Sequence, residues 1–272
     1  MTTIEQALEG AAKRIDRSEA KLLMTYLLGV SRTYLITHDR DPLTPDQRKD
    51  YEALVLRREK GEPVPYIVGS QEFYSRSFQV TPDTLIPRPD TETLIETVVH
   101  YAQEIKKPVS ILDLGTGSGC IAITLALQLP QSRVSAADIS QGALQVAQSN
   151  ASSLGANVRF FHGSWFNALN RDARFDLIVS NPPYIHPQDE HLQNLRFEPI
   201  DALTDHKDGL SDLREIITQA PQHLNQDGWL FLEHGFDQGQ AVRDLLDPGV
   251  WKNVKTVQDW GNNDRVTLAQ LI

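Results

Sequence analysis

Apolar residues recur every three or four positions through the first sixty residues, as they do along amphipathic helices. Three stretches carry this pattern, at 4–15, 19–28 and 44–60, and the third opens with a threonine capping box followed by proline. The sequence therefore predicts a small helical bundle over residues 1–62. The pattern leaves open whether this module only packs against the rest of the chain or recognises a partner protein.

Short apolar stretches broken by turn residues replace the helical pattern over residues 63–90. A Gly-Glu-Pro break ends the helices, and strands are predicted at 66–68, 73–74 and 78–80. We expect this hairpin-like segment to link the bundle to the next domain, which begins with a helix over 91–106.

Apolar stretches alternate with helical ones from residue 109 onward, which is typical of a parallel sheet covered by helices. The sequence predicts strands at 109–114, 134–139, 158–162, 175–180 and 229–233, and helices near 120–129, 141–153, 210–224 and 238–246. Its last part predicts two strands, 251–260 and 265–272, around Gly-Asn-Asn-Asp. We therefore expect an α/β fold, a Rossmann-like doubly wound sheet ending in an antiparallel hairpin, with 91–272 as the catalytic domain.

Composition narrows the class of protein. The chain has one cysteine, Cys120, which excludes a disulfide framework or a cysteine metal site, and no stretch approaches the roughly 20 apolar residues of a membrane span. We expect a cytoplasmic protein with no metal. Residues 1–62 contain 11 basic and 11 acidic residues, so the whole net charge of −10 falls on the remainder. Because nucleic-acid binding depends on basic residues, this acidic part argues against a bare duplex as partner.

The first strand of the predicted sheet runs into a glycine-rich turn that is followed by a helix. The turn consists of Gly115, Thr116, Gly117, Ser118 and Gly119. Glycines at such a point let a ligand approach the backbone at a helix N-terminus. Asp138 ends the second strand, where a carboxylate holds ribose hydroxyls in such folds. The pattern predicts a nucleoside cofactor.

Two details of the turn favour S-adenosylmethionine over a dinucleotide. Cys120 stands where the dinucleotide fingerprint needs a third glycine, and Asp113 lies two residues before the turn. A carboxylate there suits the ammonium of S-adenosylmethionine better than it suits a phosphate. Trp165 follows the strand 158–162; it is either a core indole or, as we expect from its place at the carboxyl edge of the sheet, a stacking surface for adenine.

The stretch FDLIVSNPPY, residues 175–184, predicts a buried strand that ends in a stiff polar corner. Pro182 and Pro183 fix their own φ, donate no N–H and push Asn181 toward an extended backbone. The corner therefore offers the Asn181 side-chain oxygen and backbone carbonyls as acceptors, beside the aromatic face of Tyr184. Such an arrangement suits a planar –NH2 group, either an amide or the exocyclic amine of adenine.

These residues together resemble the protein-glutamine methyltransferases that modify peptide chain release factors, and the resemblance covers most of the chain. The Asn-Pro-Pro-Tyr corner alone is shared with adenine methyltransferases, whereas the helical N-terminal module and the Pro-Arg-Pro-Asp-Thr-Glu stretch at 87–92 are specific to this family. Further matching motifs are Glu-Phe-Tyr at 72–74, Phe-Glu-Pro at 197–199, Asp-Gly-Leu at 208–210 and Glu-His-Gly at 233–235.

The resemblance implies S-adenosylmethionine as methyl donor and the side-chain amide of the glutamine in a Gly-Gly-Gln motif as acceptor. By position, Gly115 to Gly119, Asp138, Trp165 and Asn181 would contact the donor. Asn181, Pro182, Pro183 and Tyr184 would hold the glutamine, and residues 1–62 would recognise the substrate. Relatives often carry an acidic residue at the position of Ser164. In this chain the serine hydroxyl would have to accept the hydrogen bond from the adenine amine instead.

Three functions remain in competition at this point. The runner-up enzyme methylates adenine amines of RNA or DNA, which would need a basic groove. A protein that binds the donor without catalysis, and regulates through its helical module, is disfavoured by the intact corner. In the preferred reaction, the Asn181 side chain and the Pro182 carbonyl accept hydrogen bonds from the two N–H groups of the amide. After methyl transfer one proton leaves to water, because the corner contains no Asp or Glu to act as base.

Other polar residues admit a structural or a functional interpretation. Residues 185–215 hold eight acids, which form either an ordinary solvated loop or an acidic rim that steers a basic protein substrate. Glu233 and His234 end a strand and are interpreted as sheet-edge structure. The histidines at 186, 191, 206 and 223 lack the spacing of metal ligands and are expected to be structural or surface residues.

Overall fold

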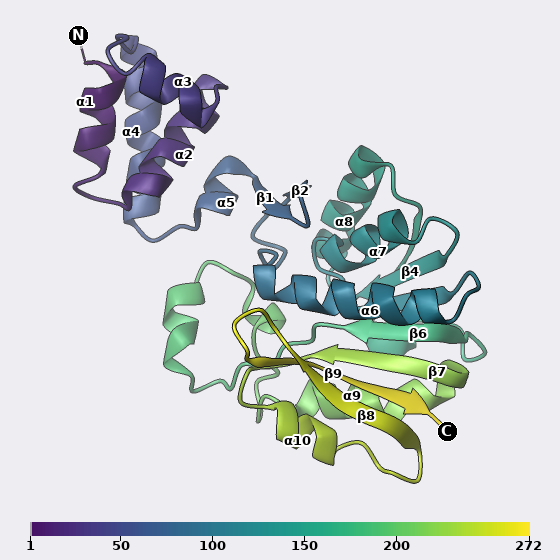
Figure 1. Ribbon diagram of the computed structural model, residues 1–272. Coiled ribbons are helices and arrows are strands. Elements are labelled where there is room, and N and C mark those ends of the chain that lie inside the picture. The colour runs from purple at the N-terminus through teal and green to yellow at the C-terminus, as the bar shows by residue number, and fades with distance from the viewer. Residues whose placement is uncertain (1) are drawn as a thin grey trace. The chain divides into compact units, whose positions relative to one another are not determined.

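The computed structural model describes residues 2–272 and divides into two compact units (Figure 1). The first ends at Ser70, and the second spans Gln71–Ile272. Among the described residues, no helix is long and apolar enough to cross a membrane, and no group of three His, Cys, Asp or Glu side chains is placed to hold a metal ion.

The N-terminal unit is a bundle of helices around one apolar core. Its helices are α1 (Ile4–Ala11), α2 (Arg17–Leu28), α3 (Arg32–Thr37), α4 (Pro45–Glu59) and α5 (Val64–Val68). Leu23 and Met24 of α2 are fully buried, and the hydroxyl of Tyr51 on α4 donates to the carbonyl of Ala20 at 2.9 Å. The predicted helical bundle is confirmed, with α3 as an additional short helix.

The strand predicted at 66–68 is wrong, because these residues belong to α5. Proline stands within the first turn of α5, where its fixed φ suits a helix, and Gly69 ends the helix in the left-handed region at φ 76°. Ile67 is buried in the core of the bundle. The apolar run Tyr-Ile-Val therefore buries one face of a single helical turn, although its composition favours a strand.

A small hairpin opens the second unit, formed by β1 (Ser70–Phe73) and β2 (Arg76–Gln79). Both residues of its turn, Tyr74 and Ser75, have left-handed φ of 49° and 58°, as two-residue hairpin turns require. The backbone N–H of Tyr74 donates to the Glu92 carboxylate at 2.8 Å, which helps to hold this unusual turn.

A seven-stranded sheet forms the second unit, in the order β5-β4-β3-β6-β7-β9-β8. The strands are β3 (Ser110–Leu114), β4 (Arg133–Asp138), β5 (Val158–His162), β6 (Phe175–Ser180), β7 (Leu224–Glu233), β8 (Trp251–Gln258) and β9 (Asp264–Leu271). The first five in spatial order are parallel, and β9 pairs antiparallel with both β7 and β8. The predicted doubly wound sheet with a C-terminal antiparallel hairpin is thus confirmed.

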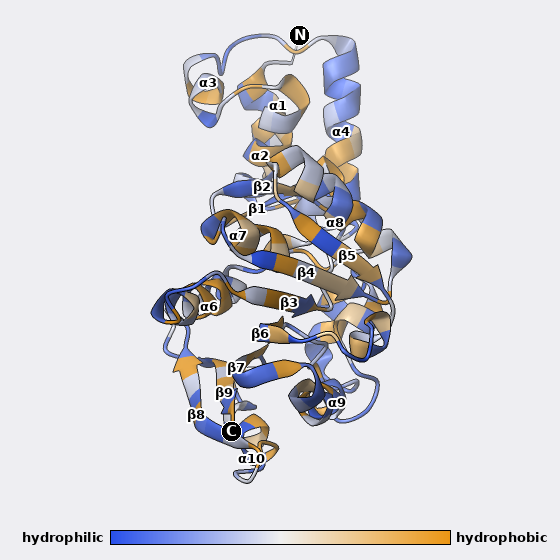
Figure 2. Cartoon of the chain, turned by 90° about the vertical axis from the view of Figure 1, so that its right-hand side faces the viewer, coloured by the Kyte–Doolittle hydropathy of each residue, from blue (hydrophilic) through white to orange (hydrophobic). Residues whose placement is uncertain are grey.

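Helices cover both faces of this sheet (Figures 1 and 2). One face packs against α6 (Glu92–Glu104), α7 (Cys120–Gln128) and α8 (Gln141–Leu154), and the other against α9 (Ser211–Gln219) and α10 (Gly239–Asp244). Short 3-10 turns lie at Pro89–Thr91, Trp165–Ala168, Glu190–Leu195, Ile200–Ala202 and Ala220–Gln222. Alternate residues of β6 enter the two cores: Leu177 and Val179 one, Ile178 the other. Each such side chain contributes about 1.5–3 kcal/mol by its burial.

Candidate active site

Two loops leave the sheet side by side at the point where its strand order reverses. Leu114 at the end of β3 pairs with Ser180 at the end of β6, and the Ser180 hydroxyl donates to the Leu114 carbonyl at 2.7 Å. The glycine turn begins at the residue after Leu114, and the proline corner begins at the residue after Ser180. Ligands of doubly wound sheets bind at this kind of switch point, outside the carboxyl ends of the strands.

The three glycines of the turn serve different purposes, although all have left-handed φ: 72° for Gly115, 55° for Gly117 and 82° for Gly119. A Cβ on Gly119 would lie 2.7 Å from Ile123 of α7 and 3.1 Å from Ala147, so this glycine permits close helix packing. A Cβ on Gly117 would meet nothing within 4 Å. The backbone at Gly117 is therefore open to a ligand, as predicted for the turn.

The side chains of Thr116 and Ser118 point into the protein. Both residues are at most 3% exposed, and the Thr116 hydroxyl donates to Asp113 Oδ2 at 2.6 Å. Any contact of these two residues with a cofactor would therefore be made by their main chain. Asp113 is fully buried, its Oδ1 has no hydrogen-bond partner within residues 2–272, and burial raises its pKa to about 7. An unpartnered buried carboxylate oxygen beside the turn suits a cationic ligand group.

Asp138 closes the turn from the neighbouring strand. Its Oδ2 accepts the Gly117 N–H and its Oδ1 accepts the Ser140 N–H, both at 2.8 Å. Burial raises the pKa of Asp138, and these two backbone donors counteract that rise. Each carboxylate oxygen retains a free lone pair, so the residue can still accept hydroxyl groups as the sequence predicts.

Trp165 lies against the glycine turn, and is half-buried at the start of its 3-10 turn. Its indole Cζ3 lies 3.3 Å from where a Cβ on Gly115 would stand, so a side chain at 115 would crowd the ring. The backbone φ of Trp165 is 44°, which is strained for a bulky residue. The structure thus brings the predicted aromatic residue to the predicted turn.

The proline corner is held at both ends. Asn181 begins it, Pro182 is buried, and the carbonyl of Tyr184 accepts a hydrogen bond from Gln238 Nε2 at 3.0 Å. The same Gln238 amide donates to the carbonyl of Gly209 at 3.1 Å, and its oxygen accepts the Gly235 N–H at 2.8 Å. One side chain therefore ties the corner to two further motifs of the chain.

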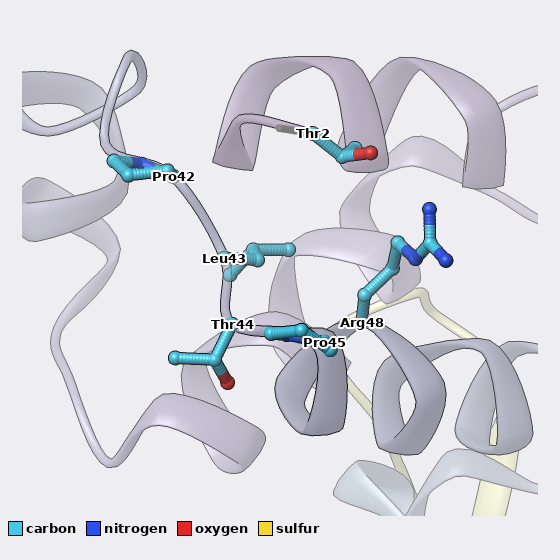
Figure 3. Close-up of a pocket in the computed structure, with 6 residues that line it drawn as sticks. All are labelled: Thr2, Pro42, Leu43, Thr44, Pro45 and Arg48. Atoms are coloured by element: carbon cyan, nitrogen blue, oxygen red, sulfur yellow. The ribbon is translucent and has the colours of Figure 1, made fainter.

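A hollow of about 70 Å³ opens beside this corner. It is lined by Leu85, Arg88, Asn181, Pro182, Tyr184, Ile185, Leu195, Ala202 and Leu203. A larger, apolar depression of about 560 Å³ lies in the N-terminal unit and is lined by Thr2, Pro42, Leu43, Thr44, Pro45 and Arg48 (Figure 3). Because the small hollow is lined by Asn181, Pro182 and Tyr184 of the corner, it is the better candidate for chemistry.

Asn181 is anchored by two residues that sequence reasoning missed as site residues. Its Nδ2 donates to the Thr91 hydroxyl at 3.3 Å, and that hydroxyl donates to Glu233 Oε1 at 3.1 Å. Thr91 is 2% and Glu233 is 1% exposed. Both residues fall in motifs shared with the resembling family, which is the signal that the sequence offers, whereas the position of Glu233 at a strand end favours a purely structural interpretation. Glu233 does end β7, and it is also connected to Asn181 through the hydroxyl of Thr91.

Arg88 and Glu198 join a second pair of distant motifs. The Arg88 guanidinium donates to Glu198 Oε1, while Oε2 accepts the Ile86 N–H at 3.0 Å. The Glu198 side chain is almost fully buried, whereas Arg88 lines the hollow and is 36% exposed. The pair fixes one wall of the hollow.

The acidic segment 185–215 is only partly a rim. Glu198 is buried against Arg88, and buried Asp205 accepts the N–H groups of Lys207, Gly209 and Ser211 at 2.8–3.0 Å. These two acids shape the loop and contribute little to a surface field. Asp212 and Glu215 are half-buried, and the other four acids are exposed. Two of these four pair with histidines: Asp189 with His191 at 2.7 Å and Asp201 with His206 at 2.6 Å.

Two other histidines are structural. His223 packs face to face with Phe166 at 4.7 Å between ring centroids and contacts the carbonyl of Ala173 at 3.1 Å. His234 is fully buried and bonds to Thr267 of β9 at 2.8 Å, and burial lowers its pKa.

Known proteins of similar fold are methyltransferases. A 16S rRNA N2 G1207 methyltransferase from T. thermophilus, solved with AdoMet and guanosine, aligns with 75% of this chain and 50% of its own at a TM-score of 0.55 and 19% identity. The hMettl16 catalytic domain, solved with an RNA hairpin, aligns with 84% of this chain and 82% of its own at a TM-score of 0.55 and 16% identity. The "Methyltransferase small domain" family model matches residues 90–198. Fold and site together define an S-adenosylmethionine-dependent methyltransferase.

Closer relatives define the family. The model described as "PrmC N-terminal domain" matches residues 1–69. Proteins named release factor glutamine methyltransferase are 45% identical in Bordetella pertussis, over 98% of both chains, and 44% identical in Vibrio cholerae, over 98% of this chain and 96% of theirs. This chain belongs to the release factor glutamine methyltransferase family.

Proposed function

We propose that this protein transfers a methyl group from S-adenosylmethionine to the side-chain amide nitrogen of the glutamine in the Gly-Gly-Gln motif of peptide chain release factors. The observation that carries the proposal is the pairing of Leu114 with Ser180, which starts the glycine turn and the Asn-Pro-Pro-Tyr corner side by side. The names of relatives that match over nearly the whole chain support the substrate.

The turn offers a suitable seat for the donor. The main chain at Gly115 and Gly117, the carboxylate of Asp138 and the indole of Trp165 would hold the nucleoside, and the unpartnered Oδ1 of Asp113 would stabilise the ammonium. When bound, S-adenosylmethionine supplies a methyl group activated by its sulfonium. Ser118 and Gly119 would contribute by shaping the backbone, since one side chain is buried and the other position packs against α7 and α8.

The proline corner would orient the acceptor. An amide nitrogen is a poor nucleophile because its lone pair is delocalised into the carbonyl. The side-chain oxygen of Asn181 and the backbone carbonyl of Pro182 would accept hydrogen bonds from the two N–H groups of the substrate amide. They would thereby favour the pyramidal, more positive nitrogen of the transition state. Tyr184 would pack on the amide plane and exclude water, with Pro183 fixing its direction. The proton would leave to water after transfer.

Positioning of this kind can supply about 7–11 kcal/mol of the barrier reduction in well-oriented reactions. A rigid corner would therefore supply a large part of the catalysis without a general base. The hydrogen bond of Gln238 to Tyr184 and the buried position of Pro182 supply that rigidity.

We further propose that the N-terminal unit contacts the release factor and that the reaction takes place in the cytoplasm on protein, not on nucleic acid. A second candidate, methylation of adenine amines in RNA or DNA, is favoured only by the chemistry of the corner, which suits both kinds of –NH2 group. The net charge of −10 opposes it, because phosphate backbones are bound by basic surfaces.

Incubation of the purified protein with methyl-labelled S-adenosylmethionine tests the proposal. Parallel reactions contain an intact release factor, the same factor with the motif glutamine replaced by alanine, tRNA, rRNA or duplex DNA. Label should enter only the intact factor, at the glutamine side chain. Label in nucleic acid would support the second candidate, and tight donor binding with no transfer at all would indicate a regulator without catalysis.

A further inference from the structure

A buried chain of hydrogen bonds runs from Glu233 through Thr91 to Asn181, and each of its links has a fixed direction. Glu233 lies at the end of β7, Thr91 in the turn before α6, and Asn181 after β6. Thr91 and Glu233 are 142 positions apart in the sequence, and the fold brings them into contact. Nothing in the proposed methyl transfer requires the first two, although both are almost completely buried beside the corner.

We infer that Glu233, acting through Thr91, fixes the orientation of the Asn181 side-chain amide so that its oxygen, and not its nitrogen, faces the substrate. Both residues are positioning residues for Asn181, and the inference rests on the role proposed for Asn181 above.

The number of protons available to the three side chains fixes the direction of each hydrogen bond. An ionised carboxylate only accepts hydrogen bonds, so the single proton of the Thr91 hydroxyl must point to Glu233 Oε1. The Thr91 oxygen is then available to Asn181 only as an acceptor. It can bond the Nδ2 of Asn181, as it does at 3.3 Å, but it cannot bond Oδ1. The side-chain oxygen of Asn181 is therefore turned away from Thr91 and is free to accept a hydrogen bond from the substrate amide.

The reverse orientation would be inactive for a physical reason. If Nδ2 of Asn181 faced the substrate nitrogen, two donors would oppose each other, and the developing positive charge would lose an acceptor. The energies of the two orientations of an isolated asparagine amide are similar, so a buried reference group is needed to select one of them. Glu233 meets that need, because its Oε1 accepts the hydrogen bond from Thr91. Its Oε2 has no partner in the part of the chain that the structure describes.

The selection depends on the charge of Glu233. Burial raises its pKa to about 7, against the opposing effects of the Thr91 hydrogen bond, of the nearby Asn181 amide and of the Arg265 charge on β9. The other ionisable groups whose charges couple to Glu233 are Asp90 before α6, Tyr184 in the corner and Cys120 of α7. A protonated Glu233 can donate to Thr91, whose proton would then point to Asn181 and admit the wrong orientation. Turnover should therefore rise as pH increases through about 7.

Four variants test the inference, with release-factor methylation, donor affinity and melting temperature measured for each. Thr91→Ser keeps the hydroxyl and should stay within about 3-fold of the parent kcat, whereas Thr91→Val removes it and should lose on the order of 10-fold or more. Thr97→Val is the control: it removes another buried hydroxyl, on α6, that bonds the Thr93 carbonyl at 2.7 Å. Its kcat should be unchanged.

Glu233→Gln supplies the sharpest comparison, because glutamine at 233 can donate or accept and so imitates the protonated acid. Its kcat should be lower than that of the parent at pH 8.5 and close to that of the parent at pH 6, and it should not change between these values. A step near pH 7 that persists in Glu233→Gln would belong to another group, such as Asp113, and would overturn the inference.

An independent readout does not use turnover. In protein labelled with ¹⁵N-asparagine, the Nδ2 signals of Asn181 are identified by their loss in Asn181→Ala. They should shift with pH through about 7 in the parent and stay constant in Glu233→Gln. Full turnover in a folded Thr91→Val alongside an inactive Asn181→Ala would refute the orienting chain while leaving the proposed function intact. Full turnover in Asn181→Ala itself would refute the proposed role of the corner.

Discussion

The hydroxyl of Ser180 and the carbonyl of Leu114 are joined by a 2.7 Å hydrogen bond across 66 positions of sequence. This bond connects the last residues of two adjacent parallel strands, so the loops that follow start from a common, rigid base. The distance between the glycine turn and the proline corner is thereby set by the sheet and not by the loops.

Replacement of Asn181 by alanine removes one acceptor of the substrate amide. We expect kcat to fall on the order of 100-fold or more, with little change in donor affinity, because the interaction is made in the transition state. Steady-state methylation of a release factor, with donor binding measured by calorimetry, checks this. A matched Asn170→Ala variant, in the loop after the 3-10 turn of Trp165, should behave as the parent.

Trp165 should contribute to donor affinity through stacking. Trp165→Ala is expected to weaken binding of S-adenosylmethionine about 10-fold, since loss of one aromatic stacking partner typically costs about 1–3 kcal/mol. Trp165→Phe should stay within a few-fold of the parent. Trp260, which is 88% exposed on the β8–β9 hairpin, provides the control, and Trp260→Ala should bind the donor normally. Equal affinities for all four proteins would exclude stacking by Trp165.

The ion pair of Arg88 and Glu198 should affect both stability and substrate affinity. Arg88→Ala leaves a buried carboxylate with only the Ile86 N–H, and should destabilise the protein by about 1–2 kcal/mol, less than a fully buried pair because Arg88 is partly exposed. Urea unfolding measures this loss. Because the pair walls the hollow, KM for the release factor should rise several-fold.

Comparison with Glu198→Gln and with the double variant separates these effects. If the two residues act as a pair, the double variant should be less unstable than the sum of the single changes predicts. Strict additivity would show that the contact contributes no coupling.

Asp113 should make the stability of the donor-free protein depend on pH. Its pKa is raised to about 7 from an ordinary value of 3.8, so the folded state holds a proton that the unfolded state releases. Its contribution is most favourable below the ordinary value and is lost as pH rises toward 7. Between pH 5 and 7.5 the parent should therefore lose roughly 2 kcal/mol more stability than Asp113→Asn, as measured by urea unfolding. Parallel pH profiles for the two proteins would contradict this.

Salt should slow the encounter with a basic protein substrate. The surface acids of 185–215 are expected to raise kcat/KM at low ionic strength, so moving from about 0.05 to 0.3 M salt should lower it several-fold. The double variant Glu190→Gln, Asp201→Asn should show a weaker salt dependence. The same charge change at two exposed acids of the second unit that lie outside the site, Glu96→Gln on α6 with Asp172→Asn before β6, serves as control. A kcat/KM independent of salt in the parent would remove the steering role.

The sheet was predictable because each strand has a local signature. The apolar run before Asn181 favours a buried strand because it is short and ends in two prolines, and the alternation of strands and helices favours a doubly wound sheet. Local sequence signals failed to predict the structure of segments whose conformation is determined by tertiary contacts. Residues 66–68 have strand composition but pack as one helical turn, and the Tyr74–Ser75 turn lacks the usual Asn-Gly signal because Glu92, 18 positions away from Tyr74, holds it.

The same distinction separates the predicted site residues from the missed ones. Glycines, prolines and an asparagine at the ends of strands indicate their function through chemistry that a sequence displays. The role of Glu233 depends on lying next to Thr91, and this contact exists only after β7 and the turn before α6 have been placed in the fold. No spacing rule connects residues 142 positions apart.

The antiparallel strand β9 has a consequence for how activity arises during synthesis. It covers the outer edge of β7, pairing Glu233 with Val266 and supplying Arg265 near the buried acid. On a translating ribosome, the proline corner at 181 emerges some eighty residues before this cover does. We therefore expect Glu233 to acquire its complete surroundings beside the corner only after residues through 271 have left the exit tunnel.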